Sequence, residues 1–252
     1  MTYICSCSGG KDSVATIILA HEKGYPLDEV IFSEVMFDEN ISGELPEHID
    51  FINNVLKPKC EEWGYKFKIV RSEKNYMWEF NRILTRSKKY PGHIGWRYGF
   101  PMAGRCVINN ECKVKPIKDY IKSIGEHRQY IGIAADEPTR LERLTDDKIS
   151  ILAKEGYTEA MAYDLCKQYG LLSPTYEFTK RGGCWFCPNA RFIELYHLYH
   201  HHRDLFEKLK ALEKEPNIIG YCWNTLTKTS IYDVEQDILA YDAQLSLFKE
   251  ET

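Results

Sequence analysis

The sequence predicts an α/β fold, with a parallel twisted sheet that carries helices on both faces and a mainly helical region after it. Two observations predict this class. Short β-like runs alternate with helix-like segments through the first half of the chain, and such runs stop after Asp136. Strands separated by helices are typical of a parallel sheet with both faces covered. We therefore expect an α/β domain over residues 1–140 and a helical C-terminal region over residues 141–252.

Each expected element has its own local pattern. The strands are expected at the short apolar runs 2–7, 29–37, 66–71 and 129–135. Helical spacing of apolar residues, or a proline in the first turn, places helices at 13–23, 46–63, 77–85 and 116–124, with a bend or break at Pro58. The later helices are expected at 147–155, 158–169, 189–213 and 233–247.

The composition is that of a folded globular protein. Hydrophobic residues make up 44% of the 252 residues and charged residues 28%, and no apolar stretch is long enough to span a bilayer. The first residues also lack the basic and apolar pattern of an export signal. We therefore expect a cytoplasmic protein with no membrane partner. The nine cysteines are an odd number, and in a reducing compartment clustered thiols favour metal binding or catalysis over disulfides.

Residues 82–105 form a basic segment within a chain of net charge −4. No Asp or Glu occurs between Phe80 and Asn110, and aromatic residues lie among the cations. The cations are Arg82, Arg86, Lys88, Lys89, Arg97 and Arg105, and the aromatic residues are Tyr90, Trp96 and Tyr98. Cations can meet phosphates while rings stack on bases, so we expect this segment to bind a nucleotide, tRNA or DNA. A solvated loop face is the alternative.

The segment Ser8–Ser13, with the sequence SGGKDS, lies between the first expected strand and the first expected helix. In a parallel α/β sheet, ligands bind at the carboxyl ends of the strands, where helix N-termini offer unpaired N–H groups. Gly9 and Gly10 let the backbone approach an anion, Lys11 adds a charge, and the serine hydroxyls add donors. The spacing matches neither G-x-x-x-x-G-K-[ST] nor G-x-G-x-x-G. The sequence therefore predicts a phosphate site of another kind, with a capped Gly-Gly turn as the alternative.

In this position SGGKDS resembles the PP-loop of the ATP pyrophosphatase superfamily, whose fold is the α/β fold of the adenine nucleotide alpha hydrolases. Members bind ATP and activate a substrate by adenylation, with release of pyrophosphate. The resemblance implies that Lys11 stabilises charge on the phosphates and that Asp12 holds Mg²⁺ or its water. It also implies a set of nucleotide-binding residues, namely Ser8, Gly9, Gly10, Lys11, Asp12 and Ser13.

Three further segments resemble the phosphoadenosine phosphosulfate (PAPS) reductase-like families: CKVKP at 112–116, GIAADEPTRLERL at 132–144 and GGCWFCP at 182–188. In that family the second segment closes over the phosphate or sulfate end of the nucleotide. The resemblance therefore implies that it contributes Asp136, Glu137, Arg140 and Arg143 to the site. A surface helix with i, i+3 charge pairs is the alternative. Asp38 falls where the family binds adenosine, although the family's usual Asp-Thr-Gly is absent here.

Four cysteines are candidate metal ligands. Cys184 and Cys187 form a C-x-x-C motif, and Cys106 and Cys112 form a looser C-x5-C motif. Four thiolates can hold Zn²⁺ or an iron–sulfur cluster, and the residue types do not separate the two. The wide C-x5-C loop favours a cluster, and the resemblance does too, because several PP-loop sulfur-handling enzymes hold a [4Fe–4S] cluster beside the nucleotide. The other thiols are expected to be packing residues: Cys5, Cys7, Cys60, Cys166 and Cys222.

His197 and His201 lie one helical turn apart, a spacing that can bind a metal. The glutamate of a zinc-protease motif is missing, so we expect a partly exposed helical face of histidines and aromatic residues instead.

These features predict an ATP-dependent enzyme that adenylates an acceptor and transfers sulfur, with a sulfur donor protein as a further partner. A sulfonucleotide reductase is one alternative, although the tail AQLSLFKEET lacks the cysteine that such reductases carry there. A module that binds adenine nucleotide or nucleic acid without catalysis is the other.

Overall fold

A five-stranded parallel sheet lies at the centre of the computed structural model, which describes residues 1–102, 104, 106–180 and 182–250. The strand order is β3-β2-β1-β5-β6, and each neighbouring pair runs parallel. This confirms the expected sheet. The bounds are Thr2–Cys7 for β1, Glu29–Ser33 for β2, Lys66–Val70 for β3, His127–Ile131 for β5 and Lys148–Ile149 for β6.

Alternate residues of the strands enter two different cores. Cys5 and Val30, which are paired in register, lie in the core that α1 (Lys11–Lys23) covers. Ile4 and Ile31 point to the other face and pack against Ile121 of α5 (Lys115–Ile124). Because side chains alternate along a strand, apolar residues at successive positions mark a sheet that is buried on both faces.

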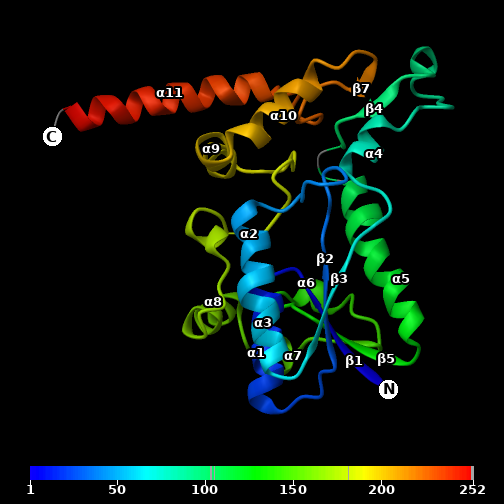
Figure 1. Cartoon of the computed structure of the whole chain (residues 1–252), viewed down its shortest axis with the longest axis vertical. Helices are drawn as coiled ribbons and strands as arrows, with labels where there is room; N and C mark the ends of the chain where they lie inside the picture. The colour runs from blue at the N-terminus through cyan, green and yellow to red at the C-terminus, as the bar shows by residue number, and fades with distance from the viewer. Residues whose placement is uncertain (103, 105, 181, 251–252) are drawn as a thin grey trace.

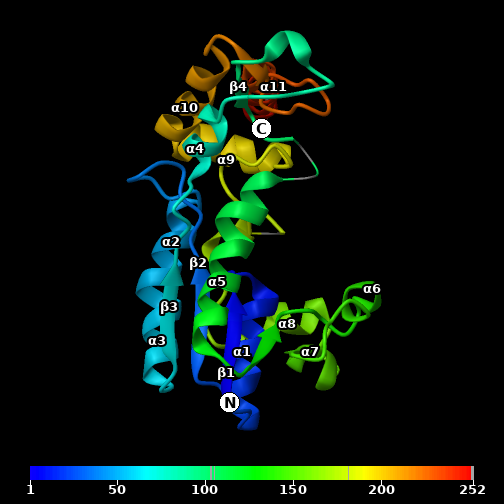
Figure 2. The same cartoon turned by 90° about the vertical axis from the view of Figure 1, so that its right-hand side faces the viewer.

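Helices cover both faces of the sheet, as expected. Helix α1 packs along α8 (Glu159–Gln168) and α7 (Ile151–Lys154) on one face, and α5 covers the other (Figure 1). The short helix α6 (Pro138–Leu141) projects outward, beyond α8 and α7 in the view of Figure 2. Among the described residues, none of the helices combines the length and apolar character that a bilayer crossing requires.

The expected helix at 46–63 is continuous but changes its winding. It consists of α2 (Pro46–Phe51), a π-helical turn (Ile52–Leu56) and α3 (Lys57–Glu62). The amide of Lys57 donates to the carbonyl of Ile52 across the wide turn. Pro58 follows directly and has no N–H to donate, so the wide turn is the local adjustment that accommodates the proline without ending the helix.

A second core lies between the C-terminal helices and the middle of the chain. It joins α4 (Tyr76–Asn81) with α9 (Phe192–His201), α10 (Arg203–Glu213) and the start of α11 (Ile231–Glu250). A small parallel sheet pairs β4 (Arg97–Gly99) with β7 (Ile218–Gly220) beside this core. The later part of α11 extends away from the rest of the molecule (Figure 1). The remaining turns are 3-10 helices at Pro91–His93 and Pro174–Glu177 and a π-helical turn at Asn109–Val114.

Two expectations about the second half were wrong. Strands do occur after Asp136, because β6 joins the main sheet and β7 pairs with β4. The expected helix at 189–213 is two helices, α9 and α10, broken at His202, whose φ of −136° and ψ of 56° are not helical. Residues 151–171 pack in the same core as the main sheet. The domain boundary near residue 140 stays a prediction.

Candidate functional site

The Ser8–Ser13 loop connects β1 to α1. Gly9 of this loop is buried, and Gly10 is partly buried. Gly9 has a φ of +73°, and a Cβ there would lie 2.5 Å from Ile52 Cδ1 and 2.7 Å from His48 Cε1. Gly10 is the N-cap of α1 and supplies no side-chain cap. The first turn of this 13-residue helix places the positive end of its dipole at the loop. The amides of Gly9 and Gly10 donate to the Cys7 thiol and the Ser8 hydroxyl, both at 3.3 Å.

Hydroxyl groups and a neighbouring histidine hold the loop in shape. The hydroxyl of Ser13 accepts from the amide of Ser8 at 3.1 Å and donates to the carbonyl of Gly10 at 2.9 Å. A ring nitrogen of His48 lies 3.0 Å from the carbonyl oxygen of Ser8, and the other lies 2.8 Å from the Ser173 hydroxyl. The serines at both ends of the motif therefore fix the loop itself, and His48, which the sequence did not single out, supports it from α2.

The hydroxyl of Tyr176 lies at the mouth of the loop. It accepts a hydrogen bond from the backbone amide of Lys11 at 2.9 Å. It would also lie 3.3 Å from a Cβ at Gly10. Tyr176 is 165 residues from Lys11 in the chain, and no sequence pattern indicated it. A tyrosine oxygen therefore takes one of the amides that an anion at a helix N-terminus would use.

The ammonium group of Lys11 lies between two carboxylates. It donates to Asp12 at 2.8 Å and to Glu159 of α8 at 2.9 Å. Burial lowers the pKa of Lys11, but the hydrogen bonds to these carboxylates outweigh it and the net pKa is raised. Burial raises the pKa of Asp12, and the charges of Glu159 and Glu137 raise it further against the effect of Lys11. Lys11 is therefore cationic and partly buried between two acids, of which Glu159 was not foreseen.

The segment 132–144, which follows β5, brings two of the residues expected from the sequence close to Asp12 and Glu159. The carboxylate of Asp136 accepts a hydrogen bond from the amide of Glu159 at 3.0 Å. The charge of Glu137 contributes to raising the pKa of Asp12. Arg140 donates to Glu137 at 2.6 Å, which is the i, i+3 charge pair of the alternative interpretation. Arg143 is exposed. The two acids thus lie beside the loop, and Arg140 is joined to it only through Glu137.

Gly132 lies directly against the start of α1. A Cβ at this position would lie 2.6 Å from the backbone nitrogen of Ser13 and 2.7 Å from the carbonyl carbon of Asp12. This close approach is the reason that a glycine stands there, and it brings the 132–144 segment to the loop.

Asp38 lies in a tight turn that follows the extension of β2. Its carboxylate accepts from the amides of Asn40 and Ile41 at 2.9 and 2.8 Å. Phe37, the residue before it, stacks on Tyr76 in the second core. Asp38 is therefore engaged as the cap of a turn, and its role toward adenosine stays a prediction.

The C-x-x-C motif forms a turn that is fastened to the strand-like segment before α2. The amide of Cys187 donates to the carbonyl of Cys184 at 3.0 Å, and Cys184 forms an antiparallel bridge with Glu44. The indole of Trp185 donates to the carbonyl of Ser42 at 2.8 Å. Backbone and side-chain bonds thus hold the two thiols at the contact between the halves of the chain.

The four candidate thiols lie close enough to influence one another. Burial raises the pKa of Cys184, and the charges of Cys187 and Cys106 contribute in the same direction. Burial raises the pKa of Cys112 to about 12, with contributions from nearby acids and from Cys106. Among the described residues, no three of these thiols have sulfur atoms within 4.8 Å of one another, so the structure does not bring the four into a closed tetrahedral set. The metal or cluster at these cysteines stays a prediction.

Lys113 pairs with Glu44, the residue that forms a backbone bridge with Cys184. The charge of Glu44 raises its pKa, against burial, and Cys184 and Cys7 contribute in the same direction. Its Nζ is 3.9 Å from Glu44 Oε1, an oxygen that has no hydrogen-bond partner among the described residues and is buried. The CKVKP segment was noted from the sequence, but neither of its lysines was. Lys113 places a cation beside the residue that bridges to the C-x-x-C turn.

No protein-family model matches the chain. A curated relative, an uncharacterised protein of Methanocaldococcus jannaschii, is 26% identical over 225 residues, which cover 81% of this chain and 45% of that protein. The chain thus spans about half the length of the curated relative that it matches.

Two solved structures are similar to the chain. A phosphoadenylyl-sulfate (PAPS) reductase from Candida auris, in complex with phosphate, has a TM-score of 0.46 at 12% identity over 73% of this chain and 82% of that one. The U34-tRNA thiolase NcsA from Methanococcus maripaludis, with its [4Fe–4S] cluster, has a TM-score of 0.40 at 16% identity over 96% and 71%.

The basic segment lines a cavity of about 910 Å³. Arg86, Lys89 and Trp96 contribute to one side, and Val107 and Ile108, next to Cys106, contribute to another. Arg82 is paired with Glu79, and its guanidinium lies 3.8 Å from the ring centre of Tyr98. Arg105 lies outside the described residues. The segment is therefore a concave surface with exposed cations that adjoins the thiol cluster.

Proposed function

We propose that the chain is an enzyme that binds ATP at the Ser8–Ser13 loop and adenylates an acceptor with release of pyrophosphate. One observation carries the proposal: the SGGKDS motif lies between β1 and α1, with no room for a Cβ at Gly9. Helix N-termini that follow a strand of a parallel sheet are sites for phosphate groups. The partly buried ammonium of Lys11 lies at the same place.

In the proposed reaction an acceptor oxygen attacks the α-phosphorus of ATP. The bond from the α-phosphorus to its bridging oxygen breaks, and pyrophosphate leaves with the bonding electrons. The loop amides and Lys11 would stabilise the charge that grows on the leaving group, and fixed donors of this kind provide a large part of catalysis. Lys11 would turn from Glu159 toward the phosphates. The oxygen donors of Asp12, Glu137 and Glu159 suit Mg²⁺, which would neutralise phosphate charge when bound.

We further propose that Cys106, Cys112, Cys184 and Cys187 hold a [4Fe–4S] cluster, with Zn²⁺ as the alternative. The C-x-x-C and C-x5-C motifs support this proposal, and a backbone hydrogen bond of 3.0 Å holds Cys184 and Cys187 in one turn. Lys113 lies 3.9 Å from Glu44, which bridges to Cys184. A cluster at this place would supply sulfur chemistry close to the activated acceptor. With this arrangement the enzyme would be a sulfurtransferase that receives sulfur from a donor protein.

The acceptor proposed here is a nucleic acid, tRNA or DNA, that binds along residues 82–105. The exposed cations and the aromatic rings of the described part of this segment support it, as does the cavity that they line. Cations of this kind bind phosphates and rings stack on bases. A cytoplasmic location belongs to the same proposal.

The proposal is tested by exchange of labelled pyrophosphate into ATP with the purified chain, Mg²⁺ and candidate acceptors. We expect exchange in the wild type and a loss of at least about a hundredfold in Lys11→Ala, because a charged contact to the leaving group is removed. Lys23→Ala is the matched control, since Lys23 is exposed at the other end of the same helix. Nucleotide binding without exchange under any acceptor condition would favour a binding module instead.

A sulfonucleotide reductase is a second candidate because Cys222 lines the 910 Å³ cavity. Burial raises the pKa of its thiol, and the thiol lies 3.5 Å from the carbonyl oxygen of Asn224. Both features disfavour the thiolate that such a reaction needs. If the chain is a sulfonucleotide reductase, the wild type should release sulfite from PAPS and Cys222→Ser should not. A wild type that releases no sulfite refutes this candidate.

A further inference from the structure

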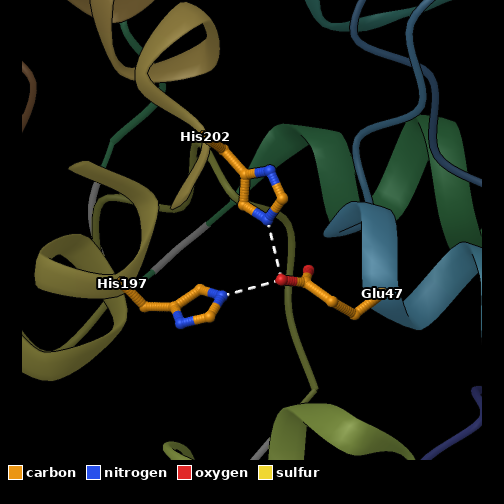
Figure 3. A group of neighbouring side chains, drawn as sticks. All are labelled: Glu47, His197 and His202. Carbon is orange, nitrogen blue, oxygen red and sulfur yellow. Dashed lines mark hydrogen bonds and ion pairs between the residues drawn. The ribbon is translucent and has the colours of Figure 1, made fainter. Parts of the chain in front are cut away.

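A carboxylate and two imidazoles converge where α2 meets the C-terminal helices. Oxygen Oε1 of Glu47 lies 2.8 Å from Nε2 of His197 and 2.8 Å from Nε2 of His202 (Figure 3). Among the described residues, these three form the single group of His, Cys, Asp or Glu whose ligand atoms all lie within 4.8 Å of one another. Glu47 lies on α2, 150 positions before His197 of α9 and 155 positions before His202, which lies between α9 and α10.

The break between α9 and α10 creates this arrangement. His202 is the non-helical residue between them, so its side chain turns back toward His197 instead of following the helix. The ring of Phe178 stacks on His197 at 3.7 Å, and His201 stacks on it at 4.4 Å. The spacing noticed in the sequence, His197 with His201, thus gives a ring stack. His202, the residue after His201, supplies the second imidazole nitrogen that approaches Glu47.

The two carboxylate oxygens of Glu47 differ in their hydrogen-bond partners. Both imidazoles approach the same oxygen of Glu47, whereas Oε2 is buried and has no hydrogen-bond partner among the described residues. An unpaired buried oxygen costs free energy unless something else satisfies it. A cation among the three side chains would accept both nitrogen lone pairs and this carboxylate at once.

We propose that Glu47, His197 and His202 bind a divalent transition metal of the Zn²⁺ type, at a site separate from the four thiols. Imidazole nitrogen and carboxylate oxygen are ligands of such metals, and three protein ligands leave one position open for water or a substrate. With metal–ligand bonds of about 2.0 to 2.2 Å, tetrahedral ligands lie about 3.3 Å apart. The side chains therefore need to open by about half an ångström to admit the ion.

The site lies next to the phosphate loop. The residue after Glu47 is His48, whose ring nitrogen contacts the carbonyl of Ser8. A metal held by α2 and the α9–α10 junction therefore connects the C-terminal helices to the element that supports the loop. Because the ion binds the folded chain, it is expected to raise the stability of this junction.

The test is a titration of the chelator-treated full chain with Co²⁺, followed by competition with Zn²⁺. Thiolate-bound Co²⁺ gives charge-transfer absorption that a site of nitrogen and oxygen ligands lacks, so a Cys184→Ser, Cys187→Ser background isolates the proposed site. In that background we expect one Co²⁺ to bind without thiolate bands. Glu47→Gln and His202→Asn should each weaken binding by at least about tenfold, as expected for loss of a ligand.

His201→Asn is the matched control, because His201 stacks on His197 but lies outside the group of three. Its Co²⁺ affinity should equal that of the background chain. Circular dichroism and thermal unfolding without metal would show that each variant is folded. The proposal is overturned if the background chain binds no Co²⁺, or if folded Glu47→Gln and His202→Asn variants retain its affinity.

Discussion

The hydroxyl of Tyr176 lies 2.9 Å from the backbone nitrogen of Lys11 and accepts its hydrogen. Lys11 is the first residue of α1, and its amide is one of those that a phosphate at this helix N-terminus would use. The tyrosine therefore competes with the proposed ligand for a donor. Nucleotide binding requires the hydroxyl to give up this bond.

We predict that Tyr176→Phe strengthens ATP binding. The variant removes the competing oxygen and keeps the ring, and a net hydrogen bond is worth about 1 kcal/mol, which corresponds to about fivefold in affinity. Calorimetric titration of both proteins with a non-hydrolysable ATP analogue measures the change. Weaker binding in the variant would show that the hydroxyl contacts the nucleotide instead of competing with it.

Gly9 and Gly24 provide a matched pair for testing the loop. Both have a positive φ, +73° and +67°, but a Cβ at Gly24 meets nothing within 4 Å, whereas one at Gly9 meets Ile52 and His48. Gly24→Ala should therefore cost about 1 kcal/mol of unfolding free energy for the left-handed backbone alone. Gly9→Ala should cost about 3 kcal/mol, because crowding adds to this strain.

Urea unfolding of the two variants measures these costs, and titration with the ATP analogue shows their effect on the site. Gly24→Ala should bind the analogue as the wild type does, and Gly9→Ala should lose binding. Equal unfolding free energies for the two variants would contradict the packing described around the loop.

The thiol cluster is tested by its metal content. We predict that Cys184→Ser and Cys187→Ser, purified without oxygen, lose the bound iron or zinc that the wild type retains. A structural metal contributes several kcal/mol, so the C-terminal helices should also become more sensitive to protease. Cys222→Ser is the control, since this buried thiol is outside the set of candidate ligands. Metal analysis and a visible spectrum decide, and unchanged metal content in the C-x-x-C variants refutes the assignment.

Glu235 joins α11 to α10 through hydrogen bonds from Lys210 at 2.9 Å and Arg203 at 2.7 Å. Burial raises the pKa of Glu235, but the hydrogen bond from Lys210 and both positive charges outweigh it, so the net pKa is lowered. A lowered carboxyl pKa gives stability that is present above the ordinary pKa and is lost as the pH falls through the folded-state value. We predict that Glu235→Gln costs about 1 to 2 kcal/mol at neutral pH.

The same variant should differ less and less from the wild type as the pH falls below the ordinary carboxyl pKa of about 4.3. Denaturant unfolding at several pH values measures this difference. A destabilisation that is constant from neutral to acidic pH would show that the charge of Glu235 is not its cause.

The sequence predicted the parallel sheet well because its signal is local. Apolar runs such as 2–7 and 29–33 form strands, and the loop between a strand and an amphipathic helix forms where the pattern changes. The strand β6, with two residues, has no periodicity to detect, and pairing with β5 alone defines it. Helix α7 and helix α8 join the first core through contacts with α1, which no local pattern indicates.

The candidate site was only partly foreseen for the same physical reason. The motif identified Lys11 and Asp12, but Tyr176 and Glu159 reach them from segments about 150 residues away. Similarly, the histidine spacing on α9 suggested His201, whereas the break at His202 and the distant Glu47 define the group of three. Long-range packing brings these residues together, so a pattern in one segment cannot contain them.

The central claim, that the Ser8–Ser13 loop binds the polyphosphate of ATP, is tested most directly by a crystal structure with Mg²⁺ and a non-hydrolysable ATP analogue. The account predicts phosphate oxygens against the amides of Gly9, Gly10 and Lys11, in place of the Cys7 thiol, the Ser8 hydroxyl and the Tyr176 hydroxyl that accept from them here. A nucleotide bound in the cavity beside residues 82–102, with Tyr176 still on Lys11, would contradict it.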